Sequence, residues 1–116
     1  MITNSEMTLY HKEFDETKRL EKWTRYNYNK VWWFGGKGAN TQKGYENAND
    51  VQIRIPYVLN TNLDIKNISI GDIVCKGNVE LEIQKQSDLD GIEIYNITAI
   101  NNNNFGNEQH IHIGGK

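Results

Sequence analysis

Apolar and polar residues alternate along most of the chain, which is the pattern of β-strands with one buried face. The alternation is clearest over 7–14, 51–57 and 92–100, and it predicts a strand at each of these places. Shorter runs rich in aromatic and β-branched residues predict further strands at 19–28, 30–34, 73–76, 79–83 and 107–113. Charge spacing also allows a short helix over 19–28, and 30–34 is either a separate strand or the continuation of 19–28 after a bulge.

Turn residues separate these runs. Gly77-Asn78 predicts a tight hairpin between 73–76 and 79–83. The segment 86–91 is expected to form one helical turn or a loop. We therefore expect a mostly β fold with little helix, either a small β-barrel or a sandwich, built from about six to eight short antiparallel strands with one long inter-strand loop.

The length of 116 residues is that of one domain. Only 37 % of the residues are hydrophobic, and a chain this short buries only about two-thirds of its unfolded surface. We expect a single β domain over 1–116 with a thin core, in which 35–50 is a long flexible loop. Contacts with partner subunits are expected to add burial that the isolated chain lacks.

The formal net charge is −2, whereas a general nucleic-acid binder normally carries a basic face. The N-terminal residues lack a basic segment followed by an apolar run, so a signal peptide is not expected. No apolar run approaches the roughly 20 residues that a membrane helix needs. These patterns predict a soluble intracellular protein without a membrane partner.

Trp32 and Trp33 are adjacent in a predicted strand, so their side chains must point to opposite faces. One of them should therefore lie outside the core, next to the long loop. Tryptophan is enriched in subunit contacts, so an exposed tryptophan at this place indicates an interface. Trp32 and Trp33 are therefore candidate interface residues.

His110 and His112 lie two residues apart and share one face of the last predicted strand. A structural zinc site needs four ligands, and the chain offers neither a cysteine pair nor a third nearby histidine. We therefore expect no metal and treat both histidines as candidate interface residues. Cys75 lies within the apolar run 73–75 and is expected to be a buried, inert thiol.

The sequence shows no residue set that is typical of catalysis. The stretch FGGKGANT at 34–41 has the glycines of a phosphate-binding loop, but Lys37 is followed by Gly38 rather than by Ser or Thr. No serine lies in a glycine-rich elbow, and the acidic residues are scattered. We therefore expect neither an enzyme nor a cofactor.

Aromatic and basic residues are interleaved in one part of the chain, at Lys22, Trp23, Arg25, Tyr26, Tyr28, Lys30 and Trp32. Rings in this pattern can stack on bases in an OB-like barrel that binds single-stranded nucleic acid. They can also fill a small core and a subunit contact. We favour the second interpretation and keep the first as an alternative function.

Four stretches of the chain resemble a family of known proteins. They are ITNSEMTLYHKEFD (2–15), IRIP (53–56), GDIVCKG (71–77) and HIHIGGK (110–116), with an aromatic strand and a long polar loop between the first two. Their order resembles the small head–tail joining proteins of tailed bacteriophages, also called head-closure or stopper proteins, and related neck proteins from phage structural modules. The resemblance spans nearly the whole chain.

The resemblance implies a small β-barrel that forms a ring, usually hexameric, in the neck of the virion beneath the portal and adaptor. Its implied partners are further copies of itself, the portal or adaptor and tail proteins, and packaged DNA, which it contacts non-specifically. The implied location is the virion neck, and before assembly the host cytoplasm, where the chain can be a monomer. A tail-completion (terminator) ring protein, with a related small β fold, is the alternative within this class.

The resemblance also implies a role for the long loop, which in that family projects toward the channel. Carried onto this sequence, the glycines supply backbone freedom and the two lysines meet phosphates, while the amide side chains pair loop to loop. The candidate channel or inter-subunit residues are Gly35, Gly36, Lys37, Gly38, Asn40, Gln42, Lys43 and Gly44.

Overall fold

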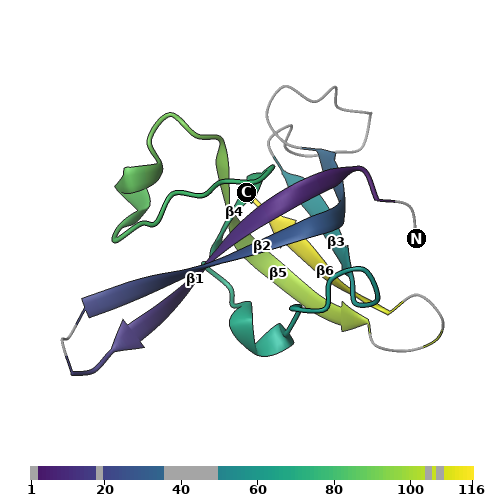
Figure 1. The fold of residues 1–116 in the computed structure, drawn as a ribbon, viewed down its shortest axis with the longest axis horizontal. Helices are drawn as coiled ribbons and strands as arrows, with labels where there is room; N and C mark the ends of the chain where they lie inside the picture. Colours follow the sequence, from purple (N-terminus) through teal and green to yellow (C-terminus); the bar gives the residue numbers. More distant parts are fainter. Residues whose placement is uncertain (1–2, 18–19, 36–49, 104–105, 107–108) are drawn as a thin grey trace.

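The computed structural model describes residues 3–17, 20–35, 50–103, 106 and 109–116 (Figure 1). Within them the chain forms six strands: β1 (Ser5–Asp15), β2 (Leu20–Gly35), β3 (Val51–Pro56), β4 (Ile73–Lys76), β5 (Ile94–Asn103) and β6 (His110–Gly115). Two short 3₁₀ turns, η1 (Ile65–Asn67) and η2 (Gln86–Leu89), are the helical elements of the described part. The mostly β fold with little helix is confirmed.

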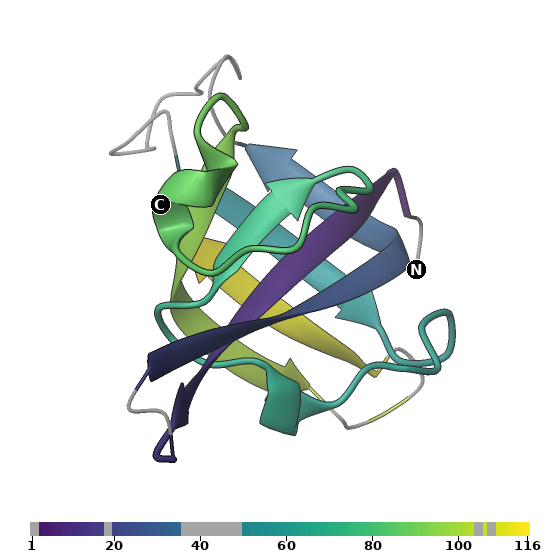
Figure 2. The same cartoon turned by 60° about the vertical axis from the view of Figure 1, so that its left-hand side comes forward.

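The strands form a closed antiparallel barrel in the order β1-β2-β3-β6-β5-β4, with β4 paired back to β1 (Figure 2). The barrel prediction is therefore confirmed, and the alternative of a sandwich is not realised. In this order β6 lies three positions from β1 in either direction, so the two strands are on opposite sides of the barrel.

β2 is one continuous strand of 16 residues, which joins the two predicted runs 19–28 and 30–34. It pairs with β1 up to Val31, and then with β3 from Trp32 to Gly35. The register with β1 shifts between Ser5 and Met7, next to the place where β2 changes partner. A bulge of this kind bends a strand, and it lets β2 turn a corner of the barrel.

The interior of the barrel is filled by the inward side chains of the strands. The largest fully buried members of this cluster are Met7, Leu9, Tyr28, Ile53, Ile55, Tyr95, Ile97, Ile111 and Ile113. Trp33 and Tyr95 meet edge to face, with ring centroids 5.9 Å apart. The alternation predicted for 51–57 is confirmed, because Val51, Ile53 and Ile55 are all buried.

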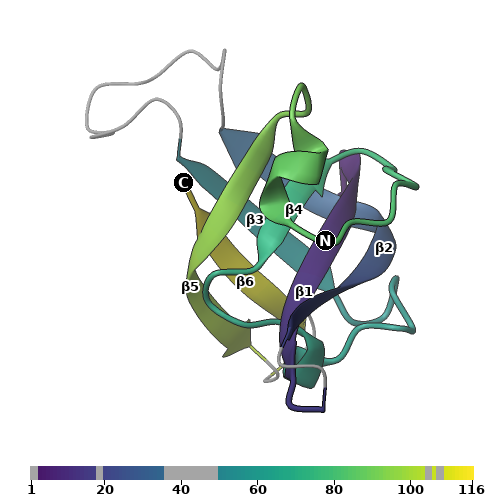
Figure 3. The same ribbon diagram turned by 90° about the vertical axis from the view of Figure 1, so that its left-hand side faces the viewer.

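The predicted strand at 79–83 is wrong, and so is the hairpin at Gly77-Asn78. β4 already has β1 on one edge and β5 on the other, which leaves no edge for a further strand. The chain from 77 to 93 instead lies across the outside of β1 and β4 (Figure 3). The Thr8 hydroxyl accepts a bond from the Val79 amide at 2.8 Å, and the Tyr10 hydroxyl donates to the Leu81 carbonyl at 2.5 Å.

This outer segment creates a second apolar cluster, which we call the outer cluster. Its buried members are Tyr10, Trp23, Ile73, Cys75, Ile83 and Leu89. The run from Met7 to His11 is consequently buried on both faces, although its sequence alternates as a half-exposed strand would. Cys75 is fully buried, as predicted, and burial raises the pKa of its thiol to about 12.

β1 and β2 extend together beyond the rest of the barrel (Figure 1). β1 pairs with β4 only from Met7 to Tyr10, whereas its pairing with β2 continues to Asp15 and Leu20. We call the two-stranded extension formed by residues 11–15 and 20–24 the arm. Phe14 on the arm is 64 % exposed.

Leu89 and Leu81 form a matched pair for testing whether the outer cluster stabilises the fold. Leu89 is 1 % exposed and Leu81 is 45 % exposed. Leu89→Ala should lower the free energy of unfolding by about 2–4 kcal/mol, because it leaves a cavity. Leu81→Ala should lower it by less than about 0.5 kcal/mol. Urea denaturation of both variants measures the difference, and equal effects would show that 77–93 adds no core.

Candidate interaction surface

Four outward side chains lie in one row across β2, β3, β6 and β5. Trp32 is the cross-strand partner of Arg54, Arg54 of His112, and His112 of Asn101. We call Trp32, Arg54, His112 and Asn101 the outer row. Directly opposed side chains on one sheet face contact each other, so the register itself assembles this surface.

Trp32 is held in place by contacts on the surface rather than by burial in the core. Its ring stacks on that of Phe34 with centroids 5.7 Å apart and planes 4° apart, and the Arg54 guanidinium lies 4.9 Å from the Trp32 ring centroid. Phe34 is 41 % exposed. The outer row thus begins with a fixed, partly exposed pair of aromatic rings beside a cation, a combination enriched at binding hot spots.

The structure confirms that the two adjacent tryptophans point to opposite faces. The prediction that both are interface residues is wrong for Trp33. Trp33 is 4 % exposed and belongs to the barrel core. Its backbone is also bonded to Asn4, whose side chain accepts from the Trp33 amide at 2.8 Å. Only Trp32 of the two can therefore contribute to a surface contact.

A hollow of about 170 Å³ lies beside the outer row. Gln52, Thr98, Ala99, Asn101, His112 and Gly114 contribute to its lining. Gly114 contributes no side chain to this lining; a Cβ there would lie 3.6 Å from the Ala99 Cβ and 3.7 Å from the Gln52 side-chain nitrogen, which are ordinary contact distances. Asp50 also lines the hollow, and its Oδ1 is buried without a hydrogen-bond partner among the described residues.

His110 and His112 share one face of β6, as predicted, but their imidazoles contact different neighbours. Nε2 of His112 lies 2.7 Å from the Gln52 side-chain oxygen on β3. Nε2 of His110 lies 3.2 Å from the Asn103 side chain on β5. Burial lowers the pKa of His112, and the Arg54 charge and His110 add to this effect. A neutral His112 donates its Nε2–H to Gln52.

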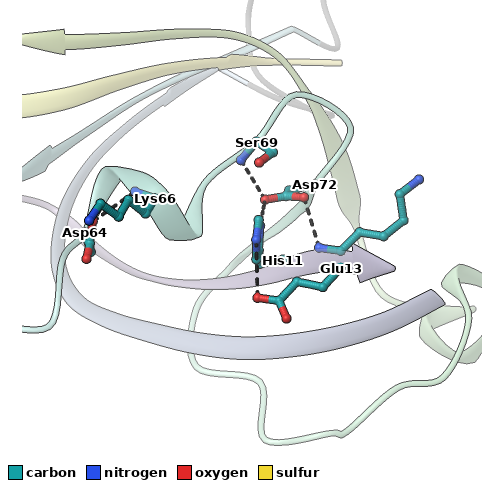
Figure 4. Close-up of polar contacts among 7 residues, drawn as sticks. His11, Glu13, Asp64, Lys66, Ser69 and Asp72 are labelled. Carbon is teal, nitrogen blue, oxygen red and sulfur yellow. Dashed lines mark hydrogen bonds and ion pairs between the residues drawn. The ribbon is translucent and has the colours of Figure 1, made fainter. Parts of the chain in front are cut away.

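A second polar cluster, which the sequence analysis missed, lies at the root of the arm (Figure 4). Nδ1 of His11 donates to Oδ2 of Asp72 at 2.7 Å, and the amides of Lys12 and Ser69 donate to the same carboxylate. Nε2 of His11 lies 3.6 Å from Glu13. Asp72 is 1 % exposed, so this buried carboxylate is satisfied by three donors and holds the arm against the turn before β4.

Most of the candidate loop residues lie outside the described part of the chain. These are Gly36, Lys37, Gly38, Asn40, Gln42, Lys43 and Gly44. Gly35 is described and ends β2 in register with Val51. Its φ of 91° is a left-handed conformation, and a Cβ there would collide with the Asp50 carbonyl oxygen. The ends of the loop are thus paired to each other next to the outer row.

The aromatic residues proposed to stack bases are divided between core and surface. Trp23 is 8 % exposed in the outer cluster, and Tyr28 is fully buried in the barrel. Tyr26 and Trp32 are partly exposed. The described residues contain no group of three or more His, Cys, Asp or Glu side chains placed to hold a metal ion. Within the same residues no helix is long and apolar enough to span a membrane.

The fold and this surface define a small, closed, six-stranded antiparallel β-barrel with an exposed aromatic and polar face. The chain belongs to a family of unknown function, DUF6751, whose model matches residues 2–116. No curated protein and no solved structure matches the chain.

Asp72 and Asp64 provide a matched test of the cluster at the root of the arm. Asp72→Ala should lower the free energy of unfolding by about 1–3 kcal/mol, because it leaves buried donors without an acceptor. Asp64 is exposed and accepts one bond, from the Lys66 amide at 2.9 Å, so Asp64→Ala should cost about 1 kcal/mol or less. Denaturant unfolding compares the two, and a milder effect at Asp72 would contradict the assignment.

His112 should make the folded state sensitive to acid. Its pKa is lowered in the folded state from the ordinary 6.5, so the unfolded chain takes up the proton more readily. The stability that neutral His112 provides to the folded state is fully present above the ordinary pKa. It is lost as the pH falls through the folded-state pKa. His112→Gln should therefore lose less stability than the wild type between about pH 7 and about pH 5. Parallel curves for the two proteins in urea titrations would refute this.

Proposed function

We propose that the chain is a structural protein of a tailed phage or prophage, a head–tail joining (head-closure) component that acts by self-assembly into a ring in the virion neck. The proposal combines the sequence resemblance with the outer row. It assigns the chain no catalytic step. Its partners in this proposal are further copies, the portal or adaptor and tail proteins, and, non-specifically, the packaged DNA.

The observation that carries the proposal is an aromatic and cationic row on the outside of a barrel whose sheet is closed. A closed barrel offers few free strand edges for association outside the arm, which favours contacts through side chains on its outer surface. Trp32, Phe34 and Arg54 are ordered on that surface by stacking and by the cation–π contact. Aromatic residues and arginine are the residue types that contribute most binding energy at subunit contacts.

The position of the long loop supports the same proposal. Gly35 and Val51 are paired, so residues 36–49 leave and re-enter the barrel at one place. Phe34 and Asp50, which flank this place, adjoin the outer row and the hollow. The described ends of the loop therefore lie beside the proposed subunit contact. In the proposal, Lys37 and Lys43 meet DNA or a neighbouring subunit.

Two alternatives remain distinct from this proposal. A tail-completion ring would use the same barrel and surface at the neighbouring joint of the virion. An OB-like module that binds single strands would need exposed stacking rings, and two of the four candidates, Trp23 and Tyr28, are buried. Salt-dependent binding of single-stranded DNA without self-assembly would favour this second alternative.

Mass spectrometry of phage particles from a culture of the source strain tests the proposal. We expect the chain to co-purify with intact particles at a copy number close to that of the portal. This copy number would place it at a joint of the neck rather than in the capsid shell. Its absence from intact particles would overturn the proposal.

Trp32 and Trp33 separate assembly from folding because they are adjacent but lie on opposite faces. Trp33→Ala should lower the free energy of unfolding by about 3–5 kcal/mol. Trp32→Ala should cost about 1–2 kcal/mol, since it removes surface stacking and a cation–π contact. Trp32→Ala should nevertheless reduce incorporation into particles, measured by quantitative mass spectrometry of variant phage. Normal incorporation of a folded Trp32→Ala protein would exclude the outer row as the contact.

A further inference from the structure

The arm presents an aromatic ring to solvent at a defined place. Phe14 is 64 % exposed, compared with 41 % for Phe34. Among the described residues, β4 covers β1 only up to Tyr10, so the arm beyond that point is two-stranded. Isolated two-stranded ribbons are only marginally stable, and a largely exposed phenyl ring adds little to the stability of this one.

The root of the arm is nevertheless fixed to the barrel. The carboxylate of Asp72 accepts bonds from His11 and from the Lys12 amide, at 2.7 and 3.1 Å. On the opposite strand Trp23 is packed in the outer cluster, and the Lys12 ammonium lies 5.7 Å from its ring centroid. A projection held in this way loses little conformational entropy when it binds.

The hollow beside the outer row has the size and the chemistry to receive such a ring. Its volume is about 170 Å³, and a cavity of roughly 150 Å³ holds one benzene molecule. Gly114 and Ala99 make the lining apolar where they meet, and Asp50 adds an acidic side chain to it. Lys12 lies two residues before Phe14 and so projects from the same face of the arm.

The arm and the hollow occupy opposite sides of the barrel. The arm continues β1 and β2, whereas the hollow is lined by residues of β3, β5 and β6, and β6 lies across the barrel from β1. A contact between these two different patches is heterologous, and repeated heterologous contacts produce a closed ring or an open filament.

We infer that the arm of one copy docks on the next copy, with Phe14 seated in the hollow over Gly114 and Ala99. Lys12, on the same face of the arm, then brings a positive charge toward the Asp50 carboxylate in the lining of the hollow. This inference rests on the proposed self-assembly and names the two surfaces that meet. His112 and Asn101 of the outer row line the hollow and so contact the docked arm.

Site-directed disulfides test the contact directly. Protein with Phe14→Cys is mixed with protein carrying Ala99→Cys, at high concentration under mild oxidation. We expect a cross-linked heterodimer from the mixture, and a ladder longer than a dimer from a chain that carries both substitutions. The native Cys75 is retained in these variants, because its thiol is buried, its pKa is raised, and it should therefore not form disulfides. Leu81→Cys, exposed beside the outer cluster, replaces Ala99→Cys as the control and should not cross-link to the arm.

Sedimentation of unlinked variants provides the second measurement. Phe14→Ala removes the ring, and Ala99→Leu fills the hollow. Each should raise the dissociation constant of self-association at least about 10-fold, which corresponds to about 1.4 kcal/mol. Val58→Ala removes a side chain that is 84 % exposed in the turn after β3 and should leave association unchanged. Circular dichroism confirms that all three variants fold.

The outcomes distinguish this inference from the proposed function. The docking of the arm is overturned if assembly persists in Phe14→Ala and Ala99→Leu, or if cross-linking is equal at Ala99 and Leu81. Neither result affects the proposed function as a neck protein. A wild-type chain that stays monomeric at millimolar concentration also overturns the docking of the arm. The proposed function is decided separately by the presence of the chain in phage particles.

Discussion

The pairing of Met7–Tyr10 in β1 with Ile73–Lys76 in β4 closes the barrel, and most other features of the molecule depend on it. Because β5 occupies the second edge of β4, the chain after Lys76 has to leave the sheet and covers Tyr10 and Trp23 from outside. Because the pairing stops at Tyr10, the rest of β1 continues with β2 alone as the arm.

This closure divides the few apolar side chains of the protein between two clusters, one on either side of β1 and β4. The barrel interior takes the inward residues such as Leu9 and Val74, and the outer cluster takes Tyr10 and Cys75. Both faces of these two strands are therefore shielded from solvent, whereas antiparallel strands in a small domain commonly expose one face. The arrangement supplies burial that a simple barrel of this length would lack.

The same topology leaves two exposed places that the proposed assembly uses. One is the outer row on β2, β3, β6 and β5, where cross-strand register brings Trp32, Arg54 and His112 together. The other is the arm, whose root is held by the Asp72 carboxylate. Both are ordered by contacts within the described chain, so the proposed assembly would need little rearrangement of either.

Periodicity in the sequence determined the β character, the strands at 51–56 and 73–76, the opposite faces of Trp32 and Trp33, and the burial of Cys75, because each depends on neighbours along the chain. Only the tertiary structure decided which strands pair. The run 79–83 alternates as a strand does, yet it finds no edge of β4 to join. His11 meets Asp72 across 61 residues, and the hollow forms where Gly114 lies between Gln52 and Ala99. Such contacts join distant segments, so local patterns carry no information about them.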